Sequence, residues 1–306
     1  MPTPILNNTT AAAPALSLPQ SLRRLFRAEL SAMVALSSLA GYLFFGGNLS
    51  VHAFLVTAGV GSLAAGCSAL NQWQEQDLDV RMERTQRRPL PMGTLSPQAA
   101  LLSASLAIGC GSLLLSALPG SLPLLLGLLA VIWYNAVYTP LKRQTPFAAI
   151  PGAICGALPP LIGWTAAGGL LITHKSLILA GTLFIWQIPH TWLLLCRYRD
   201  DLRRSGLPNI FKTIPTQRLL RINNCWLAGL FLCYLLFPLF GYIQSPVLLI
   251  SFVLSLFIVA VSMVKKPADV KQTDPIVRKF HLTNISMALL LTVLILDRLF
   301  VSFPFA

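Results

Sequence analysis

The stretch that decides the fold runs from residue 51 to residue 79 and reads VHAFLVTAGVGSLAAGCSALNQWQEQDLD. Its first part, Val51–Leu70, contains no Asp, Glu, Lys or Arg. At 1.5 Å per residue, a helix of this length spans about 30 Å, which is the thickness of the hydrocarbon core of a bilayer. The last part carries three carboxylates, Glu75, Asp77 and Asp79. This stretch therefore predicts a membrane-spanning helix that ends in a cluster of acids.

The composition of the whole chain supports a membrane protein. The 306 residues are 55% hydrophobic and only 11% charged, and the mean hydropathy is +0.69. Soluble domains carry about 25% charged residues, and a chain of this size cannot hide the difference in its core. A water-soluble globular domain is therefore excluded, whereas a bilayer accommodates apolar surfaces.

Apolar segments of similar length recur along the chain and predict an all-α, polytopic membrane protein with about nine transmembrane helices. The expected spans lie near Glu29–Gly46, Val51–Leu70, Gln98–Leu118, Leu122–Tyr138, Phe147–Gly168, Ser176–Cys196, Trp226–Ile243, Val247–Val264 and Leu282–Phe303. Residues 1–22 carry no charge and are rich in Thr, Ala, Pro and Asn, so we expect a flexible tail there and a single transmembrane domain over residues 23–306.

The basic residues predict the orientation. If the N-terminus lies in the cytoplasm, 21 of the 23 Lys and Arg residues fall on that side, and only Lys175 and Arg298 fall on the other. This asymmetry follows the positive-inside rule and places the C-terminus on the opposite side. The net charge of +13 therefore reflects membrane topology and contact with lipids, not binding to nucleic acid. The arginine-free beginning of the chain favours a bacterial cell inner membrane.

Six of the ten carboxylates fall in two segments on the predicted cytoplasmic side: Glu75, Asp77, Asp79 and Glu83 in the first, and Asp200 and Asp201 in the second. The spacing of Asn71, Glu75 and Asp79 puts all three on one face of a helix that continues the second span towards Arg84. Mg²⁺ prefers such oxygen ligands, together with substrate phosphates. Two solvated, salt-bridged loops would give the same pattern, and spacing alone leaves both interpretations open.

Several neutral residues allow two interpretations. His190 follows Trp186-Gln187-Ile188-Pro189 at the end of the sixth span, where it is either a helix-packing residue or a ligand. Aromatic residues such as Tyr134 and Tyr138 either form an interfacial belt or line a cavity. None of the six cysteines forms a C-x-x-C pair, so we expect small buried hydrophobic residues and no disulfide framework.

Five ordered motifs carry a family resemblance. Asn71–Asp79, followed by Arg84-Thr85 and Arg88-Pro89-Leu90-Pro91, resembles the first acidic motif of the UbiA superfamily of intramembrane prenyltransferases. The other matches are Tyr138-Thr139-Pro140-Leu141-Lys142-Arg143, Gly156–Trp164, Trp186–His190 and Tyr198-Arg199-Asp200-Asp201. Within the superfamily, the pattern is most similar to the branch that farnesylates heme. One departure is Glu75, which stands where an aspartate is usual.

The resemblance implies nine helices around a central cavity with the acidic motifs at its cytoplasmic mouth. It implies farnesyl diphosphate as donor, heme B as acceptor, heme O as product and Mg²⁺ or another divalent cation as cofactor. Heme A synthase and the assembly of terminal oxidases are candidate partners.

The implied site residues fall into four groups. The catalytic residues are Asn71, Glu75, Asp79, Asp200 and Asp201, of which the four acids are the metal ligands. The diphosphate-binding residues are Arg84, Arg88, Lys142, Arg143 and Arg197. His190 is a candidate heme contact.

Three alternatives remain at this stage. The acceptor could be 4-hydroxybenzoate or another quinone precursor. A transporter would need polar residues along several spans and ideally an internal repeat, whereas here the acids cluster at one rim. A non-catalytic assembly factor would tolerate loss of the acids.

Overall fold

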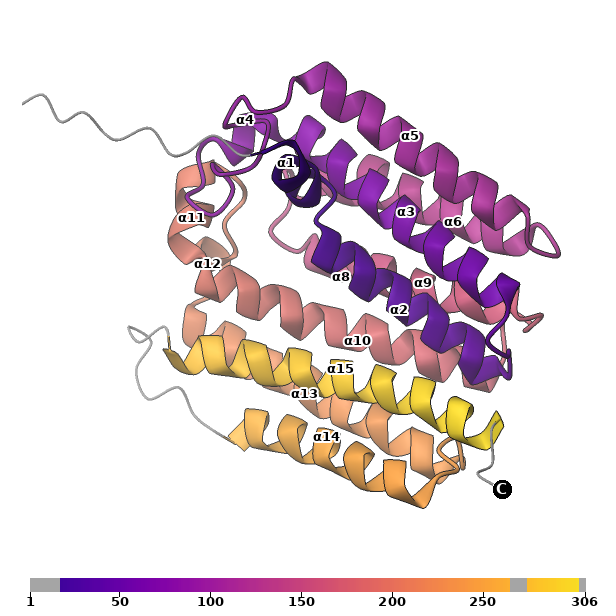
Figure 1. Cartoon of the computed structure of the whole chain (residues 1–306). Coiled ribbons are helices and arrows are strands. Elements are labelled where there is room, and N and C mark those ends of the chain that lie inside the picture. Colours follow the sequence, from indigo (N-terminus) through magenta and orange to yellow (C-terminus); the bar gives the residue numbers. More distant parts are fainter. Residues whose placement is uncertain (1–16, 265–273, 303–306) are drawn as a thin grey trace, which may run out of the picture.

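The computed structural model describes residues 17–264 and 274–302, and within these ranges every regular element is a helix. Nine spans in this part of the chain are long and apolar enough to cross a membrane, which confirms the predicted fold class. The spans run roughly side by side, with the short helices α1, α4, α11 and α12 gathered at one end of the bundle (Figure 1).

The first half of the chain forms α1 (Leu18–Leu25), α2 (Ala28–Phe45), α3 (Val51–Gln74), α4 (Gln76–Asp79), α5 (Pro97–Ser116) and α6 (Leu122–Ile132). A π-helical turn, η1 (Trp133–Tyr138), leads into α7 (Thr139–Leu141), α8 (Ala149–Gly152) and α9 (Ile154–Ala166). The second half forms α10 (His174–Arg197), α11 (Arg199–Ser205), α12 (Ile210–Thr213), α13 (Thr216–Leu239), α14 (Pro246–Val264) and α15 (Asp274–Ser302).

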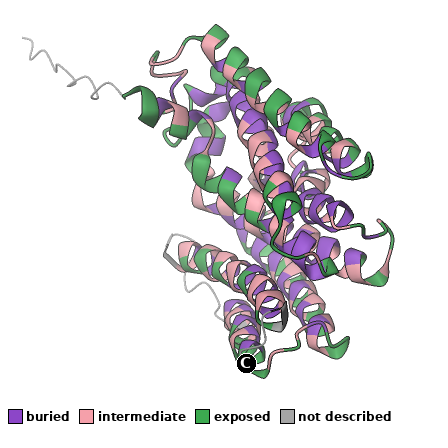
Figure 2. Ribbon diagram, turned by 45° about the vertical axis from the view of Figure 1, so that its right-hand side comes forward, coloured by how far each residue is buried: buried purple, intermediate pink, exposed green. Residues whose placement is uncertain are grey.

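The helices pack in an order that closes on itself. α3 packs against α2 and α5, α9 against α2 and α10, and α13 lies between α10 and α14. α15 contacts α14, α10 and α2, so the last helix returns to the first span. Buried residues lie where the helices face one another, and exposed residues lie around the outside (Figure 2).

α2 and α9 are in close contact through two glycines. A methyl group built on Gly163 would overlap the carbonyl oxygen of Ser38, and one built on Gly41 would overlap that of Pro160. Each helix thus presents a glycine to the backbone of the other. Small residues allow membrane helices to approach closely.

Two expected boundaries differ from the structure. Residues 18–22 were assigned to the tail but form the first turns of α1, whose Leu25 is fully buried; residues 1–16 lie outside the described residues. The second span does not continue towards Arg84, because α3 ends at Gln74 and α4 begins at Gln76. Glu75, with φ −115° and ψ 15°, is the non-helical residue between them.

Candidate active site

Glu75 is buried at the break between α3 and α4, where two side chains bind its carboxylate. The Oε2 atom accepts a hydrogen bond of 2.6 Å from Lys142 Nζ and one of 3.0 Å from Asn71 Nδ2. Asn71 Nδ2 also lies 3.1 Å from Thr139 Oγ1. The amide comes from the end of α3 and the carboxylate from the residue that follows it, whereas Lys142 and Thr139 come from the end of the fourth span. The break therefore joins two motifs that are far apart in the sequence.

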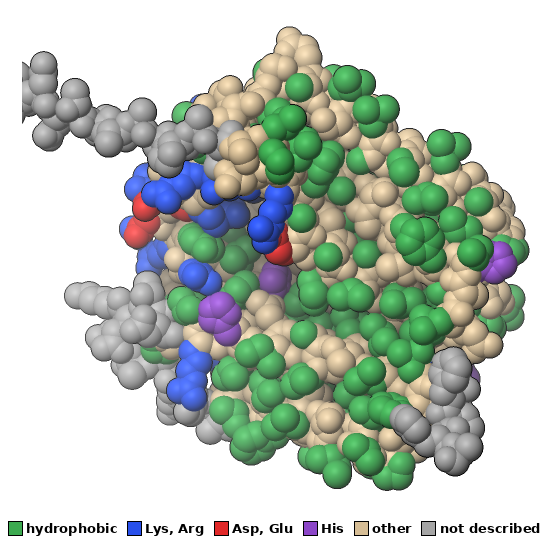
Figure 3. Space-filling model, viewed as in Figure 1, with side chains coloured by type: hydrophobic (Ala, Val, Ile, Leu, Met, Phe, Trp, Pro, Cys, Tyr) green, Lys and Arg blue, Asp and Glu red, His purple; other side chains and the backbone are tan. Residues whose placement is uncertain are grey.

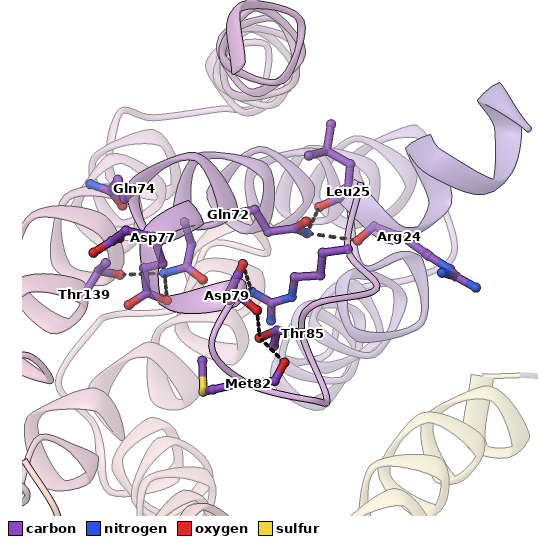
Figure 4. A network of polar contacts seen from close by, with 12 residues as sticks. Arg24, Leu25, Gln72, Gln74, Asp77, Asp79, Met82, Thr85 and Thr139 are labelled. Atoms are coloured by element: carbon purple, nitrogen blue, oxygen red, sulfur yellow. Dashed lines mark hydrogen bonds and ion pairs between the residues drawn. The ribbon is translucent and has the colours of Figure 1, made fainter. Parts of the chain in front are cut away.

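Asp79 is only 1% exposed and points towards the loop that follows α4. Its two oxygens accept hydrogen bonds of 2.9 and 2.7 Å from Arg88 Nη1, and its backbone carbonyl accepts one of 3.0 Å from Thr85 Oγ1. Figure 4 shows Asp79 beside Thr85 in this loop. Asp79 is thus paired with an arginine of its own motif, although it was predicted to share a helical face with Glu75.

A cavity of about 310 Å³ opens beside these residues. Its polar end is lined by Asn71, Arg84, Arg88 and Lys142, all of which were predicted as site residues. Its body is lined by apolar side chains of α2, α3, α6 and α9: Leu30, Val34, Val60, Leu63, Ala130, Val131 and Ile162. The cavity therefore has one cationic end and one apolar end, which suits an amphipathic ligand with an anionic head.

Basic side chains are concentrated at this end of the molecule. Figure 3 shows them gathered around a few acidic side chains, while hydrophobic side chains cover much of the rest of that face. Burial lowers the pKa of Arg84, and the nearby charge of Arg88 acts in the same direction. Burial also lowers the pKa of Lys142, although the charge of Glu75 opposes this. An anion bound here would relieve both costs.

Arg27 is a further cavity residue that the sequence reasoning missed. It lines the cavity and has φ 46°, the one positive φ of a residue other than glycine in the described ranges. Such a conformation is unusual for a long side chain and marks a position that the surroundings enforce. The junction of α1 and α2 is held by Gln72, whose Nε2 donates to the carbonyl oxygens of Arg24 and Leu25 (Figure 4). The position of Arg27 directly before the first span was the available signal.

Asp201 joins the second acidic motif to the first. Its oxygens accept hydrogen bonds of 2.9 Å from the backbone N–H of Glu83 and 3.2 Å from that of Arg84, and a further bond of 2.9 Å from Arg204. The two motifs therefore meet at one end of the bundle, as the sequence predicted. Asp200 instead is exposed and lies 3.5 Å from Arg203 of its own helix.

The acids of the two motifs differ in the direction in which their pKa values are shifted. Burial raises the pKa of Asp79 above its usual value, despite the opposing charge of Arg88. Burial also acts to raise the pKa of Asp201, yet hydrogen bonds from the Arg84 N–H and from Arg204 outweigh it and leave that pKa lowered. The hydrogen bond from Arg143 lowers the pKa of the half-exposed Asp77.

Two predicted diphosphate-binding residues lie elsewhere. Arg143 pairs with Asp77 at 2.8 Å and donates a hydrogen bond to the carbonyl oxygen of Gln74. It therefore stabilises the end of α3 from the protein surface. The guanidinium of Arg197 lies 5.3 Å from the ring centre of Tyr198. Among the described residues, neither Arg143 nor Arg197 lines the cavity.

The predicted metal site of four carboxylates is not assembled. In the described part of the chain, no three His, Cys, Asp or Glu residues lie close enough to hold a metal ion by themselves. The physical reason is that Asp79 faces Arg88, Asp201 faces backbone N–H groups and Asp200 faces outwards. One observation still fits a cation: Glu75 Oε1 is buried and has no hydrogen-bond partner among the described residues. An unpaired buried carboxylate oxygen is costly and is well satisfied by a metal ion.

His190 lines the cavity on α10, between the rings of Trp186 and Phe280 at centroid distances of 4.8 and 5.1 Å. Its Nδ1 atom lies 2.7 Å from Asn284 Oδ1. An amide oxygen can only accept, so Nδ1 carries the proton of this contact, and in a neutral ring Nε2 would keep its lone pair. Asn284 is a partner that sequence spacing did not indicate.

Tyr134 and Tyr138 also line the cavity, which resolves their open assignment in favour of the cavity. Both lie in the π-helical turn η1, with ring centres 5.7 Å apart. π-Helical turns are rare and occur frequently at functional sites. Thr139 follows directly after η1, which places its hydroxyl next to Asn71.

Comparisons with known proteins agree with this geometry. The model of the UbiA prenyltransferase family matches residues 32–285. A protein of Geobacter sulfurreducens named protoheme IX farnesyltransferase is 46% identical over 222 residues, which cover 71% of this chain and 80% of the relative. A protein of the same name from Oleidesulfovibrio alaskensis is 37% identical over 278 residues, covering 91% and 96%.

Solved structures share the fold at low sequence identity. A UbiA homologue from Aeropyrum pernix has a TM-score of 0.72 and 18% identity, and covers 90% of this chain and 98% of its own. A UbiA homologue from Archaeoglobus fulgidus bound to GPP and Mg²⁺ has a TM-score of 0.64 and 17% identity, covering 90% and 99%. Family match, relatives and fold together show that the chain belongs to the UbiA prenyltransferase family of intramembrane enzymes.

Proposed function

We propose that the chain transfers a farnesyl group from farnesyl diphosphate to a vinyl group of heme B, giving heme O. The observation that carries this proposal is the cavity with an apolar body and a cationic end, whose lining residues Lys142 and Arg88 pair with the buried carboxylates of Glu75 and Asp79. The relatives named protoheme IX farnesyltransferase favour heme over 4-hydroxybenzoate or another quinone precursor as the acceptor.

The donor fits the cavity in one direction. Its apolar tail would lie among the leucine, valine and isoleucine side chains of α2, α3 and α9, and its diphosphate would lie at the cationic end. Arg84, Arg88 and Lys142 line that end, and Arg27 adds a fourth positive charge. These groups stabilise the negative charge that develops on the diphosphate as its bond to the farnesyl carbon breaks.

A divalent cation such as Mg²⁺ would be held by Glu75 and Asp79 together with diphosphate oxygens, because Mg²⁺ commonly uses one or two carboxylates plus substrate phosphates. A structural neighbour solved with GPP and Mg²⁺ supports this cofactor. When bound, the ion would neutralise the leaving group as a Lewis acid. Asn71 would orient Glu75, and Asp201 would position the Glu83–Arg84 backbone that carries Arg84 to the cavity.

The acceptor would react within the apolar part of the cavity. The diphosphate leaves with the electron pair of the carbon–oxygen bond, and the π electrons of the heme vinyl group form the new carbon–carbon bond. Water then adds to the resulting cation and loses a proton, which gives the hydroxyl group of the product. His190 would contact heme through Nε2, with its ring held by Asn284. Exclusion of water until the carbon–carbon bond has formed prevents simple hydrolysis.

The proposed setting is a cell inner membrane with the carboxylate end of the bundle facing the cytoplasm, as the basic residues predict. Farnesyl diphosphate would then reach the cavity from the side on which the charged rim lies. Heme A synthase and terminal oxidase assembly are the partners that such a product implies.

The test is mass spectrometry of hemes extracted from cells that express the chain in a host lacking this activity. We expect a new heme with the added mass of a farnesyl group plus a hydroxyl group. The purified protein is assayed in parallel with farnesyl diphosphate and either heme B or 4-hydroxybenzoate. Transfer to 4-hydroxybenzoate without transfer to heme would overturn the choice of acceptor, and no transfer to either would overturn the proposed function.

A further inference from the structure

A second charged site lies at the end of the bundle opposite the carboxylates. Lys175 is in the first turn of α10, and Arg298 is in the last turns of α15. Although 123 positions separate them in the sequence, both cations lie over the same ring: Lys175 Nζ is 4.6 Å and Arg298 Cζ is 5.9 Å from the ring centre of Phe44. The fold thus brings two like charges together, which costs energy unless something negative lies between them.

Aromatic rings enclose the Lys175 ammonium group on further sides. Its Nζ atom is 5.7 Å from the ring centre of Trp164 and 5.6 Å from that of Tyr242. These contacts fix the position of the ammonium group, since cation–π attraction depends on the ring face. Arg298 is fixed as well, because its Nη2 donates a hydrogen bond of 3.0 Å to the carbonyl oxygen of Tyr242.

The charges of this cluster are not balanced from within. Among the described residues, neither cation has a carboxylate oxygen within 4.0 Å. The nearby Asp297 instead accepts hydrogen bonds of 2.9 and 2.8 Å from the backbone N–H groups of Gln244 and Ser245. Two cations against one carboxylate leave one net positive charge.

The cluster also contains donors without partners. The hydroxyl of Tyr242 and the Nε atom of Arg298 are buried and have no hydrogen-bond partner within the described ranges, and the same holds for the acceptor Asp297 Oδ2. Burying an unpaired donor is unfavourable, so each such atom calls for a partner such as a water, an ion or a ligand. The two donors and the Lys175 ammonium group are all able to donate hydrogen bonds to the oxygens of an anion.

The surroundings of the site are strongly apolar. Leu170, Ile172 and Leu239 are each at least 75% exposed, and Phe240 is 51% exposed. Leu170 and Ile172 lie directly before α10, and Leu239 and Phe240 lie at the end of α13. The cations are thus flanked by side chains suited to hydrocarbon. A ligand that fits both the cations and the apolar side chains needs a charged headgroup next to hydrocarbon chains, as in a membrane lipid.

We propose that Lys175 and Arg298 hold the phosphodiester of an anionic membrane phospholipid in the leaflet opposite the carboxylate end. A phosphodiester carries one negative charge, which matches the one unbalanced positive charge, whereas inorganic phosphate carries more. The apolar neighbours would contact the acyl chains, and the buried donors would contact the phosphate oxygens. The site is separate from the cavity and independent of the reaction proposed above.

The test compares lipid binding by purified protein in detergent. The probes are phosphatidylglycerol, phosphatidylcholine and inorganic phosphate, and the readouts are native mass spectrometry of bound lipid and the midpoint of thermal unfolding. At a hundredfold excess over its Kd, phosphatidylglycerol is expected to raise the midpoint by roughly 5 °C, whereas the other two probes leave it unchanged. The doubly substituted variant Lys175→Gln/Arg298→Gln is expected to lose the shift and the bound lipid.

Two further variants make the result decisive. Lys212→Gln/Arg218→Gln also removes two positive charges, but from exposed positions at the other end of the bundle, and is expected to keep the shift. Lys175→Arg/Arg298→Lys retains both charges, so it is expected to keep most of the shift even if the neutral variant folds poorly. An equal shift in the wild type and the neutral variant overturns the site. A full shift with phosphatidylcholine overturns the anionic class, and one with inorganic phosphate overturns the lipid source.

Discussion

At the scale of single residues, Glu75 and Asp77 are two positions apart and yet have opposite environments. Glu75 is 5% exposed and bound by Lys142 and Asn71, whereas the side chain of Asp77 is 49% exposed and paired with Arg143 on the surface. A buried carboxylate held by two polar groups is suited to bind a metal ion. An exposed ion pair, in contrast, contributes little to the stability of the fold. The same chemical group therefore serves two purposes within one motif.

This contrast predicts the effect of removing each charge. Glu75→Gln is expected to lower farnesyl transfer by about 100- to 1,000-fold, because it removes the charge that holds the cation at the leaving group. Asp77→Asn, the matched control, is expected to change the rate by less than about threefold. Glu75→Asp keeps the negative charge and introduces the residue usual in this motif, so it should retain substantial activity. Equal losses in Glu75→Gln and Asp77→Asn would contradict the assignment.

The burial of Lys142 predicts that the Michaelis constant for the donor depends on pH. Burial lowers its pKa, so the ammonium group loses its proton at a less alkaline pH than an exposed lysine does. The Michaelis constant for the donor should therefore rise on the alkaline side, as the positive charge facing the diphosphate disappears. In Lys142→Arg this limb should move to higher pH, because a guanidinium stays charged. An unchanged alkaline limb in Lys142→Arg would assign the titration to another group.

Asp200 and Asp201 show what sequence could not decide. The sequence placed both in one site because adjacent acids are chemically identical, but only Asp201 faces the loop that carries Arg84. Asp201→Asn is expected to raise the Michaelis constant for farnesyl diphosphate by about tenfold or more, since it loosens Arg84, with a smaller change in kcat. Asp200→Asn should stay within about twofold of wild type. A large loss in Asp200→Asn would restore it as a site residue.

At the scale of helices, the spans followed from hydropathy because the bilayer demands runs of apolar residues. Their polar ends did not: α13 begins at Thr216 and not near Trp226, and α15 begins at Asp274 and not near Leu282. These helices extend beyond the apolar segments because their backbone hydrogen bonds continue there, but the polar side chains of the extensions give no hydropathy signal. The end of α3 at Gln74 was also missed, because nothing in the local sequence predicts a break before Glu75.

The contact between α2 and α9 predicts a stability effect. Gly163→Ala should lower the free energy of unfolding by about 1–3 kcal/mol, because the methyl group meets the Ser38 carbonyl oxygen and forces the helices apart. Gly181→Ala in α10 is the control: nothing lies within 4 Å of the added methyl group, and alanine favours a helix by about 1 kcal/mol. Thermal unfolding in detergent measures both. A control variant as unstable as Gly163→Ala would show that glycine replacement itself, and not the contact, is responsible.

At the scale of the whole molecule, the two ends of the bundle differ in charge and therefore predict its orientation. The described ranges place the cavity mouth, both acidic motifs and the basic short helices at one end, and Lys175 and Arg298 at the other. Basic loops are retained in the cytoplasm during insertion, so the end with the cavity mouth should face that side. Farnesyl diphosphate, as a charged solute, would then need no passage across the membrane.

Single cysteines report this orientation, once the six native cysteines have been replaced by alanine. Asn48, which is exposed between α2 and α3, and Lys212, which is exposed in α12, mark the two ends. In intact spheroplasts a membrane-impermeant maleimide should label Asn48→Cys and leave Lys212→Cys unlabelled; inside-out vesicles should give the reverse. Labelling of Lys212→Cys from outside would invert the molecule. The diphosphate site would then open away from the cytoplasm, which an enzyme using a cytoplasmic diphosphate cannot accommodate.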